Sequence, residues 1–385
     1  MKKFAFLALC LILQACSSSN YVQKCFQRTT PEGLCAAVAH RGGWFREHDG
    51  TFYIPENSPY GIRMAARLGY PAIELDVKYT SDKVLVVMHD KTINRTMRHA
   101  ADYSKIEDPV NVWTTPFAEL REKYVLESSD PSMRTPIPTL EEMLLTCKET
   151  GIIPMLHSLV PESYSLAQKI LGDRWIAFGR DKDKMLEARK VSDCLVLWSP
   201  KVLFADVEET LEGLREIGGW CGVSTMRHDI LDAAYISAVR RAGYEVQASI
   251  FPDPHEYRAL RDGVTIELSD FFWYQTVGRK PLSRISEKLT LADGQTWKSP
   301  DLGSPDIAAL TICLKFKGDI ELSVDDYGQN DVDRHWEKKP RIYKLHRDTL
   351  GEEKLGLRLY KTAPSFEIKA LGNTQVTVAA RVYAF

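Results

Sequence analysis

The stretch from Ala72 to Val77 reads Ala-Ile-Glu-Leu-Asp-Val, and apolar and acidic residues alternate along its centre. Alternation with a period of two is typical of a β-strand, because successive side chains point to opposite faces. Glu74 and Asp76 are therefore expected to lie on the same face of this strand. Short apolar runs of similar length recur on both sides of the stretch, and amphipathic segments with helical periodicity follow them.

Strand-length runs start at residues 36, 72, 152, 175, 194, 221, 245 and 265. Helical segments are expected at 59–68, 139–148, 183–190, 205–217, 230–242 and 255–261. Eight strands alternating with helices over about 240 residues are typical of a (β/α)8 TIM barrel, an α/β fold. A doubly wound open sheet is the alternative. No Gly-x-Gly-x-x-Gly sequence follows the first run, so dinucleotide binding has no support.

The helical periodicity ends near Lys280. The runs with strand character beyond it are separated by Gly, Asn and Asp and lie at 309–316, 320–324, 341–345, 355–360, 365–370 and 376–383. This pattern predicts an all-β, sandwich-like accessory domain over residues 279–385, after a barrel domain over residues 36–278. It leaves open whether the accessory domain binds a ligand or braces the barrel.

The N-terminus begins with two lysines and the apolar stretch from Phe4 to Leu13. This stretch is shorter than the roughly 20 residues that span a bilayer, and it is typical of a secretory signal. It ends in Leu-Gln-Ala-Cys at Cys16, which resembles a bacterial lipobox. We expect a signal peptide over residues 1–15, a tether over residues 16–35, and an exported lipoprotein held at the membrane by acylated Cys16. Ordinary cleavage, with Cys16 a plain thiol, is the alternative.

The composition excludes one class of partner. The chain of 385 residues has 50 Lys and Arg against 52 Asp and Glu, a formal net charge of −2. A dedicated nucleic-acid binder carries a strong positive excess, so no nucleic-acid partner is expected. No apolar run after the N-terminal one is long enough to span a membrane.

The cysteines show no metal-site spacing, because no Cys-x-x-Cys pair occurs. Cys25 and Cys35 lie close together in the expected exported segment, which favours a small disulfide. The cysteines that lie singly in apolar or amphipathic contexts are predicted to be buried free thiols: Cys147, Cys194, Cys221 and Cys313.

Titratable residues follow several of the expected strands at their carboxyl ends, where the active sites of such barrels lie. His40 and Arg41 follow the first run, His89 follows a short run at 84–88, and His157 follows the run that starts at 152. Each residue alone is a weak signal, since a single histidine is more often structural than catalytic. Together they predict one polar rim.

Glu74 and Asp76 would share the interior of this rim. Two desolvated carboxylates repel each other unless a cation lies between them. Oxygen ligands suit a hard ion such as Ca²⁺ or Mg²⁺, so we predict a divalent metal held by these two residues. The alternative is a structural network in which they pair with Arg41 or Lys78.

Histidines beside such a metal indicate acid–base chemistry near neutral pH, because imidazole has an unperturbed pKa of about 6.5. The planar guanidinium of Arg41 suits phosphate oxygens. Two histidines, one arginine and one hard cation together match the needs of phosphodiester cleavage.

The motifs that carry these residues resemble one family as a set. In chain order they are His40-Arg-Gly, Pro55-Glu-Asn-Ser, Glu74-Leu-Asp-Val, Val86-Val-Met-His-Asp, Arg95-Thr and Ile137-Pro-Thr-Leu-Glu-Glu. They resemble the glycerophosphodiester phosphodiesterase family, in its bacterial lipoprotein form with a C-terminal β module. The resemblance implies a TIM barrel that uses two histidines and a divalent metal, commonly Ca²⁺ or Mg²⁺, to split small glycerophosphodiesters into glycerol 3-phosphate and an alcohol.

The resemblance also implies roles for individual residues. His40 and His89 correspond to the acid–base pair, Glu74 and Asp76 to metal ligands, and Arg41 to a phosphate contact. Glu56 and Asn57 would shape the substrate and phosphate site, with a position near the metal open for Glu56. The implied reaction is attack by a substrate hydroxyl through a cyclic phosphate, followed by hydrolysis.

One departure concerns the third barrel strand, where the family has a Glu-x-Lys pair. This chain has His157 at the position of the metal-binding Glu and Leu159 at that of the phosphate-facing Lys. An imidazole suits borderline metals better than Ca²⁺. Two interpretations of His157 therefore stay open: a metal ligand, and a hydrogen-bonded rim residue without metal contact.

The departure also keeps alternative functions open. The first is a catalytically impaired barrel that serves as a surface-binding lipoprotein, with the β module recognising a glycan or a protein. The second is a related barrel phosphodiesterase chemistry on inositol or sphingolipid head groups.

Overall fold

The computed structural model describes residues 36–46, 51–67, 70–200, 206–225, 233–250, 263–269, 281–303, 308–325, 327–329, 336–338, 341–359 and 365–384. The predictions of a signal peptide, of lipid attachment at Cys16, of a Cys25–Cys35 disulfide and of a helix at 255–261 concern residues outside these ranges. The chain divides into two compact units, a barrel and a β-sheet unit, which are described separately. Among the described helices, none is long and apolar enough to cross a membrane.

Parallel strands form a closed barrel. In order around the ring they are β1 (Ala36–Ala39), β4 (Ala72–Tyr79), β8 (Ile153–His157), β9 (Ile176–Gly179), β10 (Leu195–Trp198), β11 (Cys221–Thr225), β12 (Glu245–Ile250) and β13 (Ile266–Ser269). The pairing of β1 with both β13 and β4 closes the ring. The predicted TIM barrel is confirmed, and each strand begins within one residue of its predicted start.

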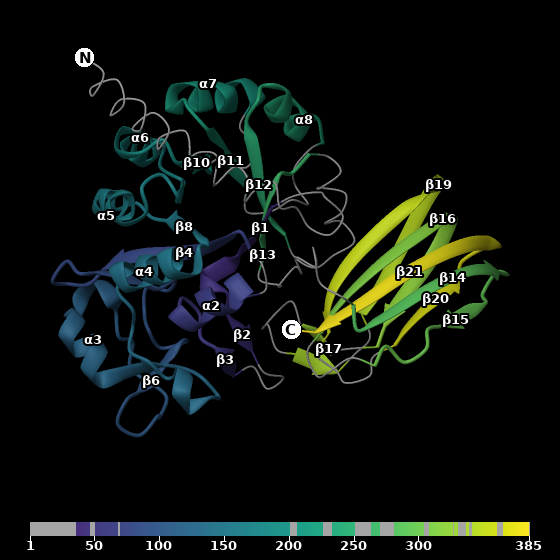
Figure 1. Ribbon diagram of the computed structural model, residues 1–385, viewed down its shortest axis with the longest axis horizontal. Coiled ribbons are helices and arrows are strands. Elements are labelled where there is room, and N and C mark those ends of the chain that lie inside the picture. Colours follow the sequence, from purple (N-terminus) through teal and green to yellow (C-terminus); the bar gives the residue numbers. More distant parts are fainter. Residues whose placement is uncertain are drawn as a thin grey trace, which may run out of the picture. The chain divides into compact units, whose positions relative to one another are not determined.

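The helices lie outside the barrel strands (Figure 1): α2 (Pro59–Arg67), α4 (Leu140–Thr150), α5 (Pro161–Leu171), α6 (Lys182–Val191), α7 (Val207–Ile217) and α8 (Ala233–Arg241). Helix α4 begins at a capping box, in which the Thr139 side chain accepts from the Glu142 N–H and the Glu142 carboxylate accepts from the Thr139 N–H. It ends at Gly151, whose φ of 75° is typical of a helix C-terminus.

The barrel interior is a packed apolar core. Its buried members come from neighbouring strands: Val38, Ala72, Ile153, Met155, Ile176, Phe178, Leu195, Leu197, Ile266 and Leu268. Burying each large apolar side chain contributes about 1.5–3 kcal/mol. Glu74 and Asp76 lie beyond Ala72 on the same face of β4, at the carboxyl end of the barrel, where the apolar filling gives way to polar side chains.

A small subdomain interrupts the barrel after β5 (Leu85–Val87), which pairs antiparallel with β4. It contains β6 (Met97–His99), η2 (Val112–Thr114), α3 (Phe117–Lys123) and β7 (Tyr124–Leu126). An apolar cluster that includes Ile93, Met97, Leu120 and Ile137 forms its own core. This subdomain was not predicted from the sequence. The subdomain nevertheless places residues at the carboxyl rim of the barrel.

Helix α2 and the turn after β1 approach each other with no room for a side chain. A Cβ atom on Gly61 would lie 1.8 Å from the carbonyl oxygen of Gly42. Gly42 itself has φ of 74°, and a Cβ there would lie 2.6 Å from Cα of Asn57. These two glycines let the backbone of residues 40–42 lie directly against α2.

We therefore expect Gly61→Ala to lower the free energy of unfolding by about 1–3 kcal/mol or more, because the added methyl group must displace backbone. Urea denaturation measures this loss. The control is Arg63→Ala on the exposed side of the same helix, expected to change stability by about 0.5 kcal/mol or less. A Gly61→Ala protein as stable as the unsubstituted one would contradict the close packing.

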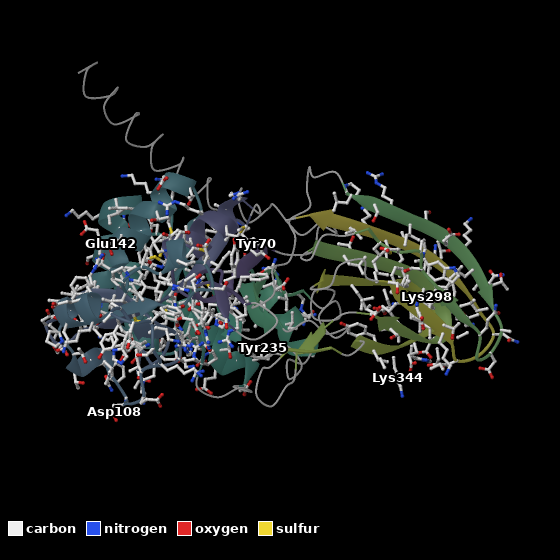
Figure 2. The ribbon with its side chains drawn as sticks, turned by 90° about the horizontal axis from the view of Figure 1, so that it is seen from below. Tyr70, Asp108, Glu142, Tyr235, Lys298 and Lys344 are labelled. Atoms are coloured by element: carbon white, nitrogen blue, oxygen red, sulfur yellow. The ribbon has the colours of Figure 1, made fainter. Side chains whose placement is uncertain are left out.

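The β-sheet unit is a six-stranded antiparallel sheet of β14 (Ser283–Leu291), β15 (Thr296–Lys298), β16 (Ala308–Val324), β19 (Arg341–Leu359), β20 (Phe366–Ala370) and β21 (Thr374–Ala384). A separate pair is formed by β17 (Tyr327–Gln329) and β18 (Trp336–Lys338). Buried and exposed residues alternate along the strands, as at Tyr343, Lys344 and Leu345, of which only Lys344 is exposed (Figure 2). The predicted all-β region is confirmed.

Two strand predictions in this unit were wrong. The runs at 309–316 and 320–324 belong to the single strand β16, because Gly318 lies at an irregularity in the pairing instead of in a turn. The runs at 341–345 and 355–360 likewise fall on β19. Strands β14 and β15 were not predicted.

Three of the four cysteines that the structure describes are buried free thiols, as predicted: Cys147, Cys194 and Cys221. The prediction for Cys313 was wrong in part, because this side chain is only partly buried. It alternates with buried Ile312 and Leu314 on β16 and therefore lies on the other face of the strand.

Candidate active site

The chain turns sharply after β1, through the 3-10 helix His40–Gly42. Arg41 has φ of 47° in this turn, a left-handed conformation that non-glycine residues rarely adopt. Two hydrogen bonds hold it there: the Arg41 N–H donates to Glu74 Oε2 at 2.8 Å, and the Asn57 N–H donates to the Arg41 carbonyl at 2.7 Å. Such strained backbone is often found at functional sites.

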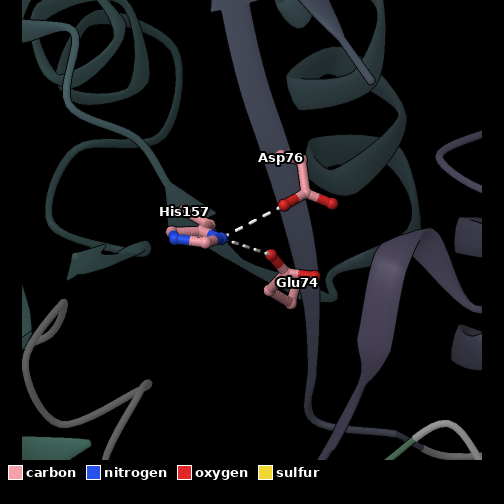
Figure 3. Close-up of side chains that lie close together, drawn as sticks. All are labelled: Glu74, Asp76 and His157. Atoms are coloured by element: carbon pink, nitrogen blue, oxygen red, sulfur yellow. Dashed lines mark hydrogen bonds and ion pairs between the residues drawn. The ribbon is translucent and has the colours of Figure 1, made fainter. Parts of the chain in front are cut away.

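Glu74, Asp76 and His157 meet at the centre of the rim (Figure 3). His157 Nδ1 lies 3.1 Å from Asp76 Oδ1 and 3.6 Å from Glu74 Oε1. Parallel pairing of β4 with β8 sets Asp76 opposite His157, which explains the short distance. Both carboxylates are buried, whereas the side chain of His157 is 36% exposed and faces the cavity described below.

The charges of this cluster shift its ionisation. Burial lowers the pKa of His157, but the hydrogen bonds and charges of Asp76 and Glu74 outweigh burial and raise the pKa to about 9. Burial raises the pKa of Asp76, yet the hydrogen bond and charge of His157 outweigh burial and hold the pKa well below its usual range. Both carboxylates thus stabilise the positive charge of His157.

The cluster also fits a divalent metal ion. Its ligand atoms lie within 4.8 Å of one another, and buried Glu74 Oε1 has no closer polar partner than His157 Nδ1 at 3.6 Å. Neighbouring ligand atoms around an octahedral ion with bonds of 2.1–2.2 Å are about 3 Å apart, close to the Asp76–His157 distance. Two carboxylates and one imidazole form a donor set for a hard to borderline ion.

His89 lies beside this cluster because the Met88 N–H donates to the Asp76 carbonyl at 2.8 Å. Arg41 Nη2 lies 3.0 Å from His89 Nε2, and an arginine can only donate, so Nε2 accepts this hydrogen bond. The proton of neutral His89 is therefore on Nδ1, which donates to Asp90 Oδ1 at 2.6 Å. The ring is fixed with Nε2 toward Arg41.

Asp90 is held in turn by Arg95. Burial raises the pKa of Asp90, but the hydrogen bonds from His89 and Arg95 outweigh it and keep the pKa below its usual range. Arg95 also donates to both carboxylate oxygens of Glu56, at 2.8 and 2.7 Å. Arg41 Nη1 lies 3.5 Å from Glu56 Oε1, so the buried carboxylate of Glu56 pairs with two arginines.

The predicted site residues thus have different surroundings. His40 Nε2 lies 3.9 Å from Glu74 Oε2, and the charges of His40 and His89 both act on Asp76. Glu56 contacts arginines, and the Asn57 side chain donates to Asp76 Oδ2 at 3.2 Å. These contacts position neighbouring side chains, and the expected role of Glu56 and Asn57 in the substrate and phosphate site stays a prediction.

No roles were predicted from the sequence for Asp90 and Arg95, although both lie in the motifs that carried the resemblance. Lys78 was considered only as a structural partner of Glu74 or Asp76. Lys78 is the next residue after Asp76 on the same face of β4, and burial lowers its pKa against the opposing charge of Asp76.

A cavity of about 460 Å³ opens beside the cluster. Asp76, His89 and His157 form part of its lining, together with Lys78, Lys83 and Trp113 among others. The cavity therefore connects the ionisable cluster to the solvent, and Lys78 and Lys83 form part of its lining.

The closed barrel and the acidic and imidazole groups at the carboxyl ends of its strands define a (β/α)8 barrel with an enzyme-like rim. Residues 40–157 match the glycerophosphoryl diester phosphodiesterase family. The matched segment contains all eight predicted site residues.

Individual relatives match over shorter or more distant stretches. The chain is 35% identical over 125 residues to glycerophosphodiester phosphodiesterase 1 of Mus musculus, which is 32% of this chain and 34% of that protein. It is 27% identical over 220 residues to a glycerophosphoinositol inositolphosphodiesterase of the same organism, 51% of this chain and 37% of that protein. The chain thus spans about a third of the length of these relatives.

Among solved structures, an Oleispira antarctica phosphodiesterase in complex with its product sn-glycerol-3-phosphate has a TM-score of 0.49 and 20% identity. That comparison covers 64% of this chain and 96% of the other.

Proposed function

We propose that this protein is a metal-dependent phosphodiesterase that hydrolyses glycerophosphodiesters to glycerol 3-phosphate and an alcohol. The observation that carries the proposal is the convergence of His40, Arg41 and His89 on the buried Glu74, Asp76 and His157 cluster. All of these residues lie in the segment that matches the family.

Glu74, Asp76 and His157 would hold the divalent ion. The bound ion supplies positive charge that neutralises the non-bridging oxygens of the phosphodiester. The imidazole favours a borderline ion such as Mn²⁺ or Zn²⁺ alongside Mg²⁺, and makes Ca²⁺ a poorer match than an all-oxygen site would.

The two histidines divide the proton transfers. One accepts the proton of a substrate hydroxyl, whose oxygen attacks phosphorus, while the other protonates the departing alkoxide. The P–O bond to the alcohol breaks as the bond to the attacking oxygen forms, giving a cyclic phosphate. Water then opens the cyclic phosphate, with the same two groups in exchanged roles. Asp90 keeps the His89 ring oriented through both steps.

Arg41 and Lys78 supply positive charge for the phosphate. The Arg41 guanidinium lies 3.0 Å from His89, whose imidazole is part of the cavity lining. Lys78 lines the cavity beside Asp76, on the same face of β4. We assign to Lys78 the phosphate-facing charge that is missing at Leu159, whose side chain is exposed at the same cavity.

The test is turnover by purified protein, followed by ³¹P NMR. The substrates are glycerophosphocholine, glycerophosphoethanolamine and glycerophosphoinositol, each with Mg²⁺, Ca²⁺, Mn²⁺ and Zn²⁺ in turn. We expect a glycerol 3-phosphate resonance that requires the metal and is abolished by chelation. The absence of product with every pair of substrate and metal would overturn the proposal. Tight binding of a diester without product would instead support the impaired barrel as a surface-binding protein, which the Leu159 substitution favours.

We further propose that the protein is exported and anchored in the membrane through acylated Cys16, on the periplasmic, outer-membrane or cell-surface side. The support is the sequence that ends at Cys16. Metabolic labelling with radioactive palmitate is expected to mark the unsubstituted protein and Cys25→Ser equally, and to leave Cys16→Ser unlabelled. Equal labelling of Cys16→Ser would contradict acylation at this position.

A further inference from the structure

The mouth of the cavity is chemically distinct from its acidic end. Its solvent-facing lining includes Tyr79, Lys83, Trp113 and Leu159, which we call the mouth residues. Trp113 and Leu159 are 48% and 52% exposed, so both side chains present apolar surface at the cavity. The mouth residues lie on the same cavity as Asp76, His89 and His157, so a ligand with its phosphate at the cluster would extend toward them.

Lys83 occupies a backbone position that favours glycine. Its φ is 65°, in the turn where the Lys83 N–H donates to the Thr80 carbonyl at 3.1 Å. A side chain in this conformation is disfavoured relative to glycine, so local folding does not explain the lysine. Strain of this kind points to a role for the side chain.

The ammonium group of Lys83 lies over an aromatic ring of the same mouth. Its Nζ is 5.1 Å from the centre of the Tyr79 ring. A second ammonium group, Lys91 Nζ, lies 6.0 Å from the centre of the exposed Trp113 ring. Cation–π contacts hold both lysines near the aromatic faces without neutralising their charge.

The acidic groups near the mouth are engaged elsewhere or lie outside the cavity lining. Asp82 Oδ1 accepts hydrogen bonds from the Thr80 hydroxyl and the Phe117 N–H. Glu162 interacts with the Tyr79 hydroxyl and with the charge of Lys83, but it is not part of the lining. Among the described residues that line the cavity, the only carboxylate is Asp76, at the metal end.

We propose that the mouth residues form the subsite for the alcohol portion of the substrate, and that this subsite selects head groups with a negative charge of their own over head groups with a quaternary ammonium. The inference rests on the proposed phosphodiesterase function and names its substrate class. Lys83 attracts the distal anion, and Trp113 packs against the head group. A choline head group would lie near the ammonium groups of Lys78 and Lys83, whose like charges disfavour its binding.

Three diesters that differ in the charge of the head group test the proposal: glycerophosphoinositol 4-phosphate, glycerophosphoinositol and glycerophosphocholine. We expect kcat/KM to fall in that order at low ionic strength, with the spread reduced at high salt. Equal values, or a preference for the choline diester, would overturn the proposal.

Lys83 variants separate charge from folding. Lys83→Gly is expected to reduce the preference for the anionic over the cationic diester about three- to tenfold, without lowering Tm, because glycine adopts the positive φ freely. Lys83→Glu is expected to reduce it further. The matched control is Lys148→Glu in the last turn of α4, which precedes the start of β8 and so lies at the opposite end of the barrel. If the Lys83 variants kept the same preference for the anionic over the cationic diester as Lys148→Glu, the proposal would be overturned.

Binding measured without turnover distinguishes the two hypotheses. If none of the diesters is hydrolysed, the proposed phosphodiesterase function is wrong. Calorimetric Kd values for the same three compounds then still show whether the mouth residues select anionic head groups. Tighter binding of the anionic compound, lost in Lys83→Glu, supports the subsite. Equal Kd values, or the reverse order, reject it.

Discussion

Replacing His89 with alanine is expected to lower kcat by about 10²–10⁴-fold, the usual contribution of one positioned acid or base. The structure gives the reason. His89 Nδ1 is fixed on Asp90, and its Nε2 is turned toward Arg41, beside the acidic cluster. Alanine removes the proton carrier and leaves Asp90 paired with Arg95, so the fold is expected to survive. Steady-state kinetics on the best glycerophosphodiester substrate measures the loss, and thermal unfolding checks the fold.

The control for this substitution is His346→Ala. His346 lies in the β-sheet unit, with a side chain that is 56% exposed and that pairs with Asp319 and Asp348. Its removal is expected to change kcat by less than about twofold, because surface substitutions away from a site have small effects. A His89→Ala enzyme that keeps a third or more of the original kcat would exclude His89 from the chemistry.

Replacing Asp76 with asparagine is expected to weaken metal binding by at least about 100-fold and to reduce turnover accordingly. Replacing even a residue that only supports a metal ligand typically lowers metal affinity or activity by about 10–100-fold. Asp76 is itself one of the two proposed carboxylate ligands. Asparagine keeps the size of the side chain and can still accept the hydrogen bond from His157. Calorimetric titration with Mn²⁺ reports the affinity.

Asp108→Asn provides the matched control, because Asp108 is exposed on the subdomain and is not one of the three residues that could hold a metal (Figure 2). This variant should bind Mn²⁺ as tightly as the unsubstituted protein. If Asp76→Asn also retained full affinity, the ion would have to bind elsewhere and the assignment of Glu74, Asp76 and His157 would be wrong.

The barrel could be predicted from the sequence because runs of strand length alternate with segments of helical periodicity over about 240 residues. The alternation in Ala72–Val77 even placed Glu74 and Asp76 on one face, as the structure does. Local signals sufficed here, since strand periodicity and the capping box at Thr139 are properties of short segments.

The support of the site could not be predicted in the same way. Asp90, Arg95 and Glu56 form one chain of ion pairs, yet Glu56 and Arg95 are separated by 39 positions and by the strands β4 and β5. No periodicity reports a side-chain contact over that distance. The positive φ of Arg41 and Lys83 was equally invisible, because both are residue types that normally avoid it.

The strand predictions in the β-sheet unit failed for a different reason. Gly318 was read as a turn residue, but it lies at a bulge within β16, where apolar residues are buried on both sides of it, such as Phe316 and Ile320. A glycine with positive φ serves a turn or a bulge equally well, and only the partner strand distinguishes them. Tertiary pairing therefore decided the length of the strand.

The proposed function requires one divalent ion among Glu74, Asp76 and His157, next to His40 and His89, and this position can be tested. Crystals grown with Mn²⁺ and measured at an energy where manganese scatters anomalously test it most directly. We expect one strong anomalous peak about 2.0–2.4 Å from a carboxylate oxygen of Glu74, from one of Asp76 and from a ring nitrogen of His157. A map without a peak among these three residues, from protein shown in solution to bind Mn²⁺, would contradict it.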